Sequence, residues 1–230
     1  MKKLVLGLSI VTTLLGLSIA LAAKPNPIDY RRSLFVPVGQ KMLVMEAPKG
    51  MCFLDPSQYG ERKAYERLKD MAEKQGKDVF LGAFAPCLTV AGYGVSGNFD
   101  LDLLNAGTVT WLNPSVGEQT PLDRKEYLDG RAPSFRKSVE TAFKAAAAPN
   151  DKYTFDETPR VSENGMSLGF TADIKMEDVL YKSAGVVATT SLRHIPIEVM
   201  IRYTQKERHD REKIQRLADK FLAQQIALNE

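Results

Sequence analysis

The chain is poor in the residues that most catalytic and metal sites require. Its 230 residues include two cysteines, two histidines and one tryptophan. These residues form no H-x-x-x-H, H-E-x-x-H or C-x-x-C spacing, so the usual zinc sites and the tight redox-active dithiol are excluded. The chain also lacks G-x-S-x-G, the nucleophile elbow of many serine hydrolases. The sequence therefore predicts no metal, no cofactor and no catalytic residue set.

An excess of one charge is missing as well. The chain carries 31 Lys and Arg against 28 Asp and Glu, and the two signs are interleaved in stretches such as ERKAYERLKD, residues 61–70. A protein that follows a phosphate backbone needs a continuous basic stripe. The composition therefore predicts that nucleic acid is not a partner.

What the sequence does contain begins at the N-terminus. Lys2 and Lys3 precede an apolar run over 4–19, and Ala20-Leu21-Ala22 follows as a small-x-small pattern. This order is typical of a secretory signal peptide. We interpret 1–22 as a cleaved signal, which predicts a periplasmic or secreted protein. The segment is close to the length that spans a bilayer, so membrane contact is expected only if it stays uncleaved.

Hydrophobic periodicity predicts both strands and helices in the rest of the chain. The expected strands cover 34–38, 42–46, 51–54, 78–87, 167–174, 185–192 and 197–203. The expected helices run from Asp55 to Gly76 and over 122–128, 134–148 and 206–228. Because strands and helices do not alternate one for one, we predict an α+β fold with an antiparallel or mixed β-sheet flanked by helices, and a long C-terminal amphipathic helix. Residues 23–230 are expected to form one domain with a helical insertion around 120–150.

The two cysteines flank the first expected helix. Cys52 lies in the strand before it and Cys87 at the end of the strand after it. Because the chain returns beside its starting point, and an exported protein meets oxidising conditions, we expect a Cys52–Cys87 disulfide. Two buried free thiols and a functional thiol remain alternatives.

Two further sequence patterns resemble ligand sites, but we do not predict a ligand at either of them. Residues 92–97 match G-x-G-x-x-G, the dinucleotide-binding pattern, but too few residues follow for the helix that a pyrophosphate site needs. We predict a loop or hairpin connection there. Asp100 and Asp102 lack the glycine-bearing loop of a calcium site, so we interpret them as solvated carboxylates.

Two segments carry a resemblance to a known family. MEAPKGMCFLD (45–55) precedes the first long helix, and GVVATTSLRHIPIEVMIRYTQ (185–205) forms a hairpin before the last helix. This layout resembles the PsbP/Mog1-like α/β/α sandwich of proteobacterial envelope proteins. The resemblance implies an accessory, assembly or binding role.

The sequence thus predicts an exported, non-catalytic envelope protein that binds a protein partner or a small ligand. The expected binding regions are the sheet face, the loops around 91–105 and the helical insertion. The alternative is an envelope hydrolase or thiol enzyme that uses Cys87 with His194.

Overall fold

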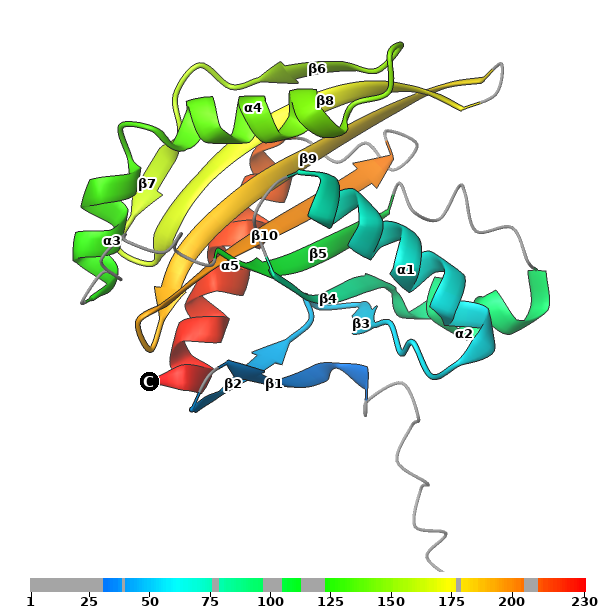
Figure 1. The fold of residues 1–230 in the computed structure, drawn as a ribbon, viewed down its shortest axis with the longest axis horizontal. Coiled ribbons are helices and arrows are strands. Elements are labelled where there is room, and N and C mark those ends of the chain that lie inside the picture. The colour runs from blue at the N-terminus through cyan, green and yellow to red at the C-terminus, as the bar shows by residue number, and fades with distance from the viewer. Residues whose placement is uncertain are drawn as a thin grey trace, which may run out of the picture.

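The computed structural model of the protein describes residues 31–38, 40–75, 79–96, 105–112, 123–176, 179–204 and 211–230 (Figure 1). The predicted signal segment 1–22 lies outside these residues, as do Asp100 and Asp102. None of the described helices is both long enough and apolar enough to cross a membrane.

An antiparallel β-sheet forms the centre of the fold. Its strand order is β3-β4-β5-β10-β9-β8-β6, and β7 also pairs with β8. The strands are β3 (Met51–Phe53), β4 (Val79–Pro86), β5 (Ala106–Trp111), β6 (Lys152–Phe155), β7 (Arg160–Ser162), β8 (Gly165–Met176), β9 (Val179–Leu192) and β10 (Ile195–Thr204). A separate two-stranded sheet consists of β1 (Ser33–Val38) and β2 (Lys41–Glu46).

The predicted hairpin between the last two strands of the chain is confirmed. β9 and β10 pair over ten positions, from Ile195 opposite Leu192 to Thr204 opposite Ser183. Arg193 and His194 form the two-residue turn with φ values of 50° and 67°. Positive φ at both positions is the geometry whose twist matches that of the flanking strands. The turn is shorter than the expected four-residue connection, since Ile195 and Pro196 already belong to β10.

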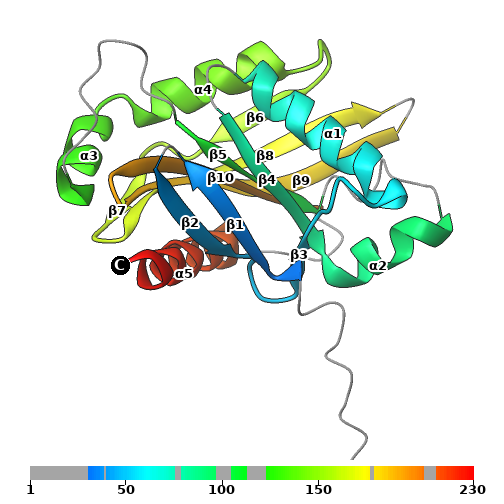
Figure 2. The ribbon, with the colours of Figure 1, turned by 60° about the horizontal axis from the view of Figure 1, so that its bottom comes forward.

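Three helices cover one face of the large sheet (Figure 2). They are α1 (Tyr59–Lys74), α3 (Arg124–Arg131) and α4 (Phe135–Ala146). Ala64 and Leu68 of α1 pack in a buried cluster with β3, β4 and β5 residues, while Phe135, Val139 and Phe143 of α4 belong to a cluster with β8 residues. The helices expected within the insertion are therefore present and lie on the sheet.

The opposite face is covered by the C-terminal helix α5 (Arg211–Asn229) and by the β1–β2 hairpin (Figures 1 and 2). Ile214, Phe221 and Ile226 share the largest buried cluster with Leu43 and Met45 of β2 and with the inward side chains of β9 and β10. With helices on both faces of an antiparallel sheet, the predicted α+β class with a long C-terminal helix is confirmed.

The first helix begins later than the sequence predicts. We expected Asp55 to cap it and Pro56 to occupy its first turn, but α1 begins at Tyr59 after Gln58. The Asp55 carboxylate instead accepts a hydrogen bond of 2.8 Å from the Ser57 N–H, which closes a turn two residues long. The Asp55 carboxylate therefore stabilises the turn that precedes α1, and the residue at the N-cap is Gln58.

The structure differs from the sequence prediction in two more segments, neither of which shows a clear hydrophobic periodicity. The strand β6 lies within 147–158, which the sequence shows only as a polar linker. The glycine-rich residues 92–94, expected in a loop or hairpin, lie inside the helix α2 (Cys87–Ser96). Glycine lowers helix propensity, so tertiary contacts override the local preference in α2. These contacts include packing of α2 on α1.

Candidate functional site

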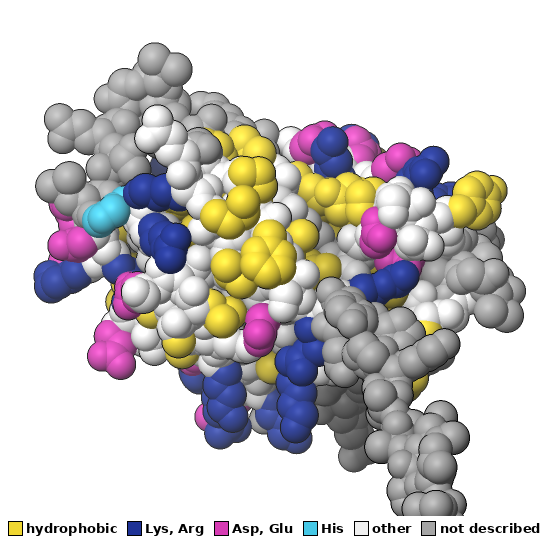
Figure 3. Space-filling model, turned by 90° about the horizontal axis from the view of Figure 1, so that it is seen from below, with side chains coloured by type: hydrophobic (Ala, Val, Ile, Leu, Met, Phe, Trp, Pro, Cys, Tyr) yellow, Lys and Arg dark blue, Asp and Glu magenta, His cyan; other side chains and the backbone are white. Residues whose placement is uncertain are grey.

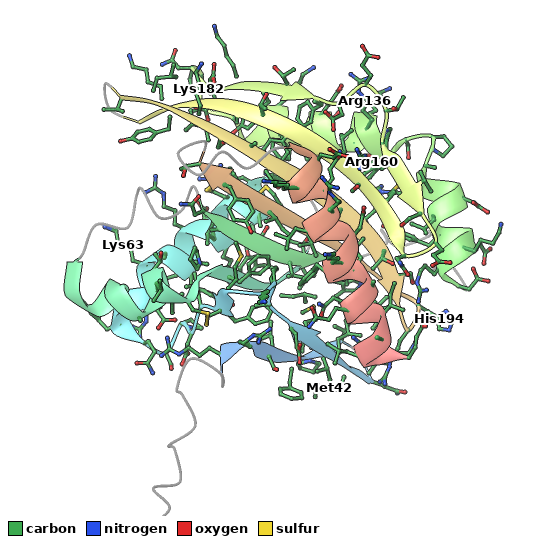
Figure 4. All side chains as sticks on the ribbon, turned by 180° about the vertical axis from the view of Figure 1, so that it is seen from behind. Met42, Lys63, Arg136, Arg160, Lys182 and His194 are labelled. Carbon is green, nitrogen blue, oxygen red and sulfur yellow. A yellow bond between two sulfur atoms is a disulfide. The ribbon has the colours of Figure 1, made fainter. Side chains whose placement is uncertain are left out.

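The structure does not bring together the two residues of the predicted thiol site. Cys87 follows β4, whose Phe84 pairs with Gly107, and Gly107 pairs with Ile201 near the end of β10. His194 lies in the turn before Ile195, at the start of β10. About 20 Å of strand separates these two levels. In Figure 4, His194 points outward on the side of the molecule away from Lys63 of α1, the helix that packs on α2.

The two cysteines are instead close to each other. Their Sγ atoms lie 2.02 Å apart, which is bonding distance. Both side chains are buried in the cluster beneath α1, and the Cys87 N–H donates a hydrogen bond of 2.9 Å to the Gly50 carbonyl oxygen. The pair therefore belongs to the core that fixes α1 and α2 on the sheet.

The glycine-rich residues are equally far from a nucleotide site. Gly92 lies in the second turn of α2, so its backbone N–H is used within the helix rather than presented to a phosphate. Gly97 lies outside the described residues. Within the described part of the chain, no three His, Cys, Asp or Glu side chains lie close enough to hold a metal ion.

A groove lies on the helical face of the sheet. It lies between the C-terminal end of α1 and the inner side of α4, above β5 and β10, and has a volume of about 640 Å³. Its apolar lining comes from Leu112, Val139, Ala142 and Ala145. Small side chains on α4 leave this space between the helices, because alanine cannot fill the distance that a leucine would cover.

Polar side chains surround this apolar surface, and most of the charged ones are basic. They are Lys74, Gln75, Arg131, Ser134, Lys137, Ser138, Thr141 and Glu198. Glu198 of β10 is the acidic residue in this lining, against three cations. The groove therefore carries net positive charge next to an apolar surface.

Two of the three cations have no acidic partner among the residues that the structure describes. Lys74 forms an ion pair of 2.6 Å with Asp70, whereas Arg131 and Lys137 form none with any described residue. The Nε of Arg131 is buried and has no hydrogen-bond partner among the described residues. A buried donor without a partner costs free energy, so an anion at this position would satisfy it.

Their neighbours on the same two helices behave differently. Arg124, Lys125 and Arg136 all pair with carboxylates, Lys125 with Asp129 at 2.6 Å and Arg136 with Glu140 at 2.8 Å. Of the α3 and α4 cations compared here, Arg131 and Lys137 of the groove lining are thus the two that form no ion pair with a described residue. These charges suit an anionic ligand, and the apolar floor suits one with an apolar body.

The sequence contained no signal for this groove. The periodicity of α4 predicts its buried stripe correctly, with Phe135, Val139 and Phe143 inside. The groove depends on Lys74 of α1 and Glu198 of β10, which are remote from α4 in the sequence and meet it only through the fold. No protein-family model matches this chain, and no curated protein matches it, so the site is interpreted on its geometry alone.

Proposed function

We propose that the protein is an exported, non-catalytic protein of the bacterial envelope, and that it binds a small anionic ligand with an apolar body in the groove between α1 and α4. The observation that carries the proposal is that Arg131 and Lys137, which form no ion pair with a described residue, line a groove of about 640 Å³ with an apolar floor. Both sides of the groove belong to packed helices, so the site needs little ordering on binding.

Two observations support the proposed periplasmic or secreted location. Cysteines at bonding distance fit an oxidising compartment, and the N-terminal pattern of residues 1–22 is that of an export signal. We also propose a PsbP/Mog1-like layout, because an antiparallel sheet with helices on both faces has the layers of that sandwich. A fold analogy does not identify a ligand, so the class of ligand is proposed from the residues of the groove.

A thiol enzyme built on Cys87 and His194 has no geometric support. The Cys87 sulfur is at bonding distance from Cys52, and His194 lies at the opposite end of β10. A protein partner in the envelope remains part of the proposal, and cross-linking in cells followed by mass spectrometry would identify it.

The groove is tested with 1-anilinonaphthalene-8-sulfonate, a fluorescent probe that joins an apolar body to one sulfonate. We expect saturable one-to-one binding that weakens with added salt. Arg131→Gln and Lys137→Gln should each weaken binding by about tenfold or more, because a charge-assisted hydrogen bond is lost. Ala142→Trp should abolish binding by filling the groove.

Two controls make the outcome specific. Lys144→Gln removes an exposed cation of the same helix outside the groove and should leave the affinity unchanged. N-phenyl-1-naphthylamine, which lacks the sulfonate, should bind more weakly than the anionic probe. Equal affinity of all variants, or equal affinity for the neutral probe, would refute an anion site in this groove.

A further inference from the structure

The β1–β2 hairpin exposes an apolar surface on the side of the molecule opposite the groove. Alternation along the strands sends Val36, Val38, Leu43 and Met45 into the core. Phe35, Pro37 and Met42 point outward, and the side chains of Phe35 and Met42 are 65% and 47% exposed. In Figure 3, hydrophobic side chains form a group in the middle of this face, and Figure 4 shows Met42 directed away from the body.

These side chains are held in place and cannot fold inward. Pro37 pairs with Met42 and Phe35 with Val44 across the hairpin. The far edge of β2 is bonded to α5, since the amide groups of Asn229 and Gln225 hydrogen-bond to the backbone of Val44 and Glu46. The hairpin therefore presents its apolar residues from a rigid platform.

Both basic and acidic side chains lie around this apolar surface (Figure 3). At the hairpin tip, Lys41 donates to the carbonyl oxygen of Arg193, and Arg193 donates to the carbonyl oxygens of Asn229 and Met42. Within the described part of the chain, neither Lys41 nor Arg193 forms an ion pair with a carboxylate. Of the acids nearby, Glu230 is paired with Arg124, and Glu46 accepts a hydrogen bond from Gln224.

We propose that this face, defined by Phe35, Pro37, Met42, Lys41 and Arg193, attaches the protein to an anionic lipid surface. Exposed apolar side chains beside two cations that pair with no described carboxylate complement the boundary between acidic headgroups and acyl chains. A stable protein interface uses roughly 20–30 residues on each side. The few apolar side chains of the hairpin fall far short of that, yet they suffice for reversible attachment to a membrane. The proposal does not depend on a ligand in the groove.

The test must report on the hairpin itself, because the apolar run over 4–19 can also bind lipid. Met42→Cys, labelled with the fluorophore NBD in the whole chain, gives such a report, since the native cysteines lie at bonding distance from each other. We expect NBD emission to rise and shift to the blue with vesicles of phosphatidylcholine and phosphatidylglycerol. Nitroxide-labelled lipid should quench it, and vesicles of phosphatidylcholine alone should give a much smaller change.

Matched variants separate the apolar contact from the charges. Tyr59→Cys and Leu88→Cys place the label at residues that are 92% and 85% exposed elsewhere, and they should show no blue shift. Lys41→Glu combined with Arg193→Glu should reduce the fraction of protein responding at position 42 at least severalfold. Lys144→Glu, the same change in charge on α4, should leave the response intact.

Three results would overturn the proposal. One is an unchanged NBD spectrum at position 42 with anionic vesicles. Another is an equal shift at position 59 or 88, which would indicate attachment through another part of the chain. The third is a shift at position 42 that depends on protein concentration without vesicles, because it would make a second copy of the chain the occupant of this face.

Discussion

The side-chain amide of Asn229 makes two hydrogen bonds with the backbone of Val44. The Val44 N–H donates to Oδ1 at 3.0 Å, and Nδ2 donates to the Val44 carbonyl oxygen at 2.7 Å. One turn earlier, Gln225 bonds in the same way to Glu46, at 2.9 and 3.0 Å. The two amides thus take the place that a third strand would occupy beside β2, and they fix the hairpin to α5.

Replacing Asn229 by leucine should destabilise the protein by about 2–4 kcal/mol. The substitution keeps most of the volume but leaves a buried N–H and a buried carbonyl of Val44 without partners. Urea unfolding measures the loss, and amide hydrogen exchange at Val44 should accelerate. Gln224→Ala is the control, because Gln224 bonds the half-buried Glu46 side chain rather than the backbone, and it should cost less than about 1 kcal/mol. An Asn229→Leu protein as stable as the parent would show that the amide bonds contribute nothing.

Gly107 in β5 is expected not to tolerate a side chain. A Cβ at this position would lie 2.3 Å from the Phe84 ring and 2.7 Å from the Met200 carbonyl oxygen. The backbone cannot move aside in the middle of the sheet, so Gly107→Ala should cost about 1–3 kcal/mol of stability.

Gly130 provides the matched comparison. It lies in α3, and a Cβ there meets nothing within 4 Å. Because alanine is the better helix former, Gly130→Ala should be neutral or stabilising by up to about 1 kcal/mol. Thermal or urea unfolding of both variants checks the pair, and a reversed order would contradict the packing around Gly107.

The hydrophobic pattern of the sequence was sufficient to predict the fold class, because the helices and strands that define this class are long and periodic. Apolar residues alternate along β8, β9 and β10 and form a stripe on α5. Both patterns arise because one face of each element is buried, whichever surface it packs against. The sequence even places Gln225 in the buried stripe of α5, although it gives no reason for a glutamine there. The reason is the backbone of Glu46, which lies 179 residues away along the chain.

The candidate site was not predictable for the same physical reason. The cations Arg131 and Lys137 look like ordinary exposed residues of a helix until the end of α1 and the floor strand β10 are placed beside them. A cation that has no ion-pair partner can attract an anionic ligand. The fold decides which cations are paired, so the sequence alone does not show it. By contrast, the proximity of Cys52 and Cys87 followed from a simple strand-helix-strand path.

The carboxyl of Asp55 should titrate below its ordinary range. Hydrogen bonds from the Ser57 hydroxyl and from the Ser57 N–H hold the pKa of Asp55 below its usual value of 3.8. Because the ionised form is favoured in the folded state, the stabilisation is complete above pH 3.8 and is lost as the pH falls through the lowered pKa. Carbon-13 NMR titration of Asp55 checks the direction. Ser57→Ala removes the hydroxyl but keeps the N–H, so it should raise the pKa part of the way, and an unchanged value would contradict this cause.

Reduction of the two cysteines should weaken the protein measurably. A bond between Cys52 and Cys87 closes a loop of 35 residues, which on the chain-entropy model stabilises the folded state by roughly 3–4 kcal/mol. Urea unfolding with and without a reductant measures this difference. The double variant Cys52→Ala, Cys87→Ala should match the reduced protein closely and should not respond to the reductant. Thiol titration of the denatured, unreduced protein should find no free sulfhydryl. Two reactive thiols in that assay would show that the cysteines are only neighbours, and would remove the main physical support for an oxidising compartment.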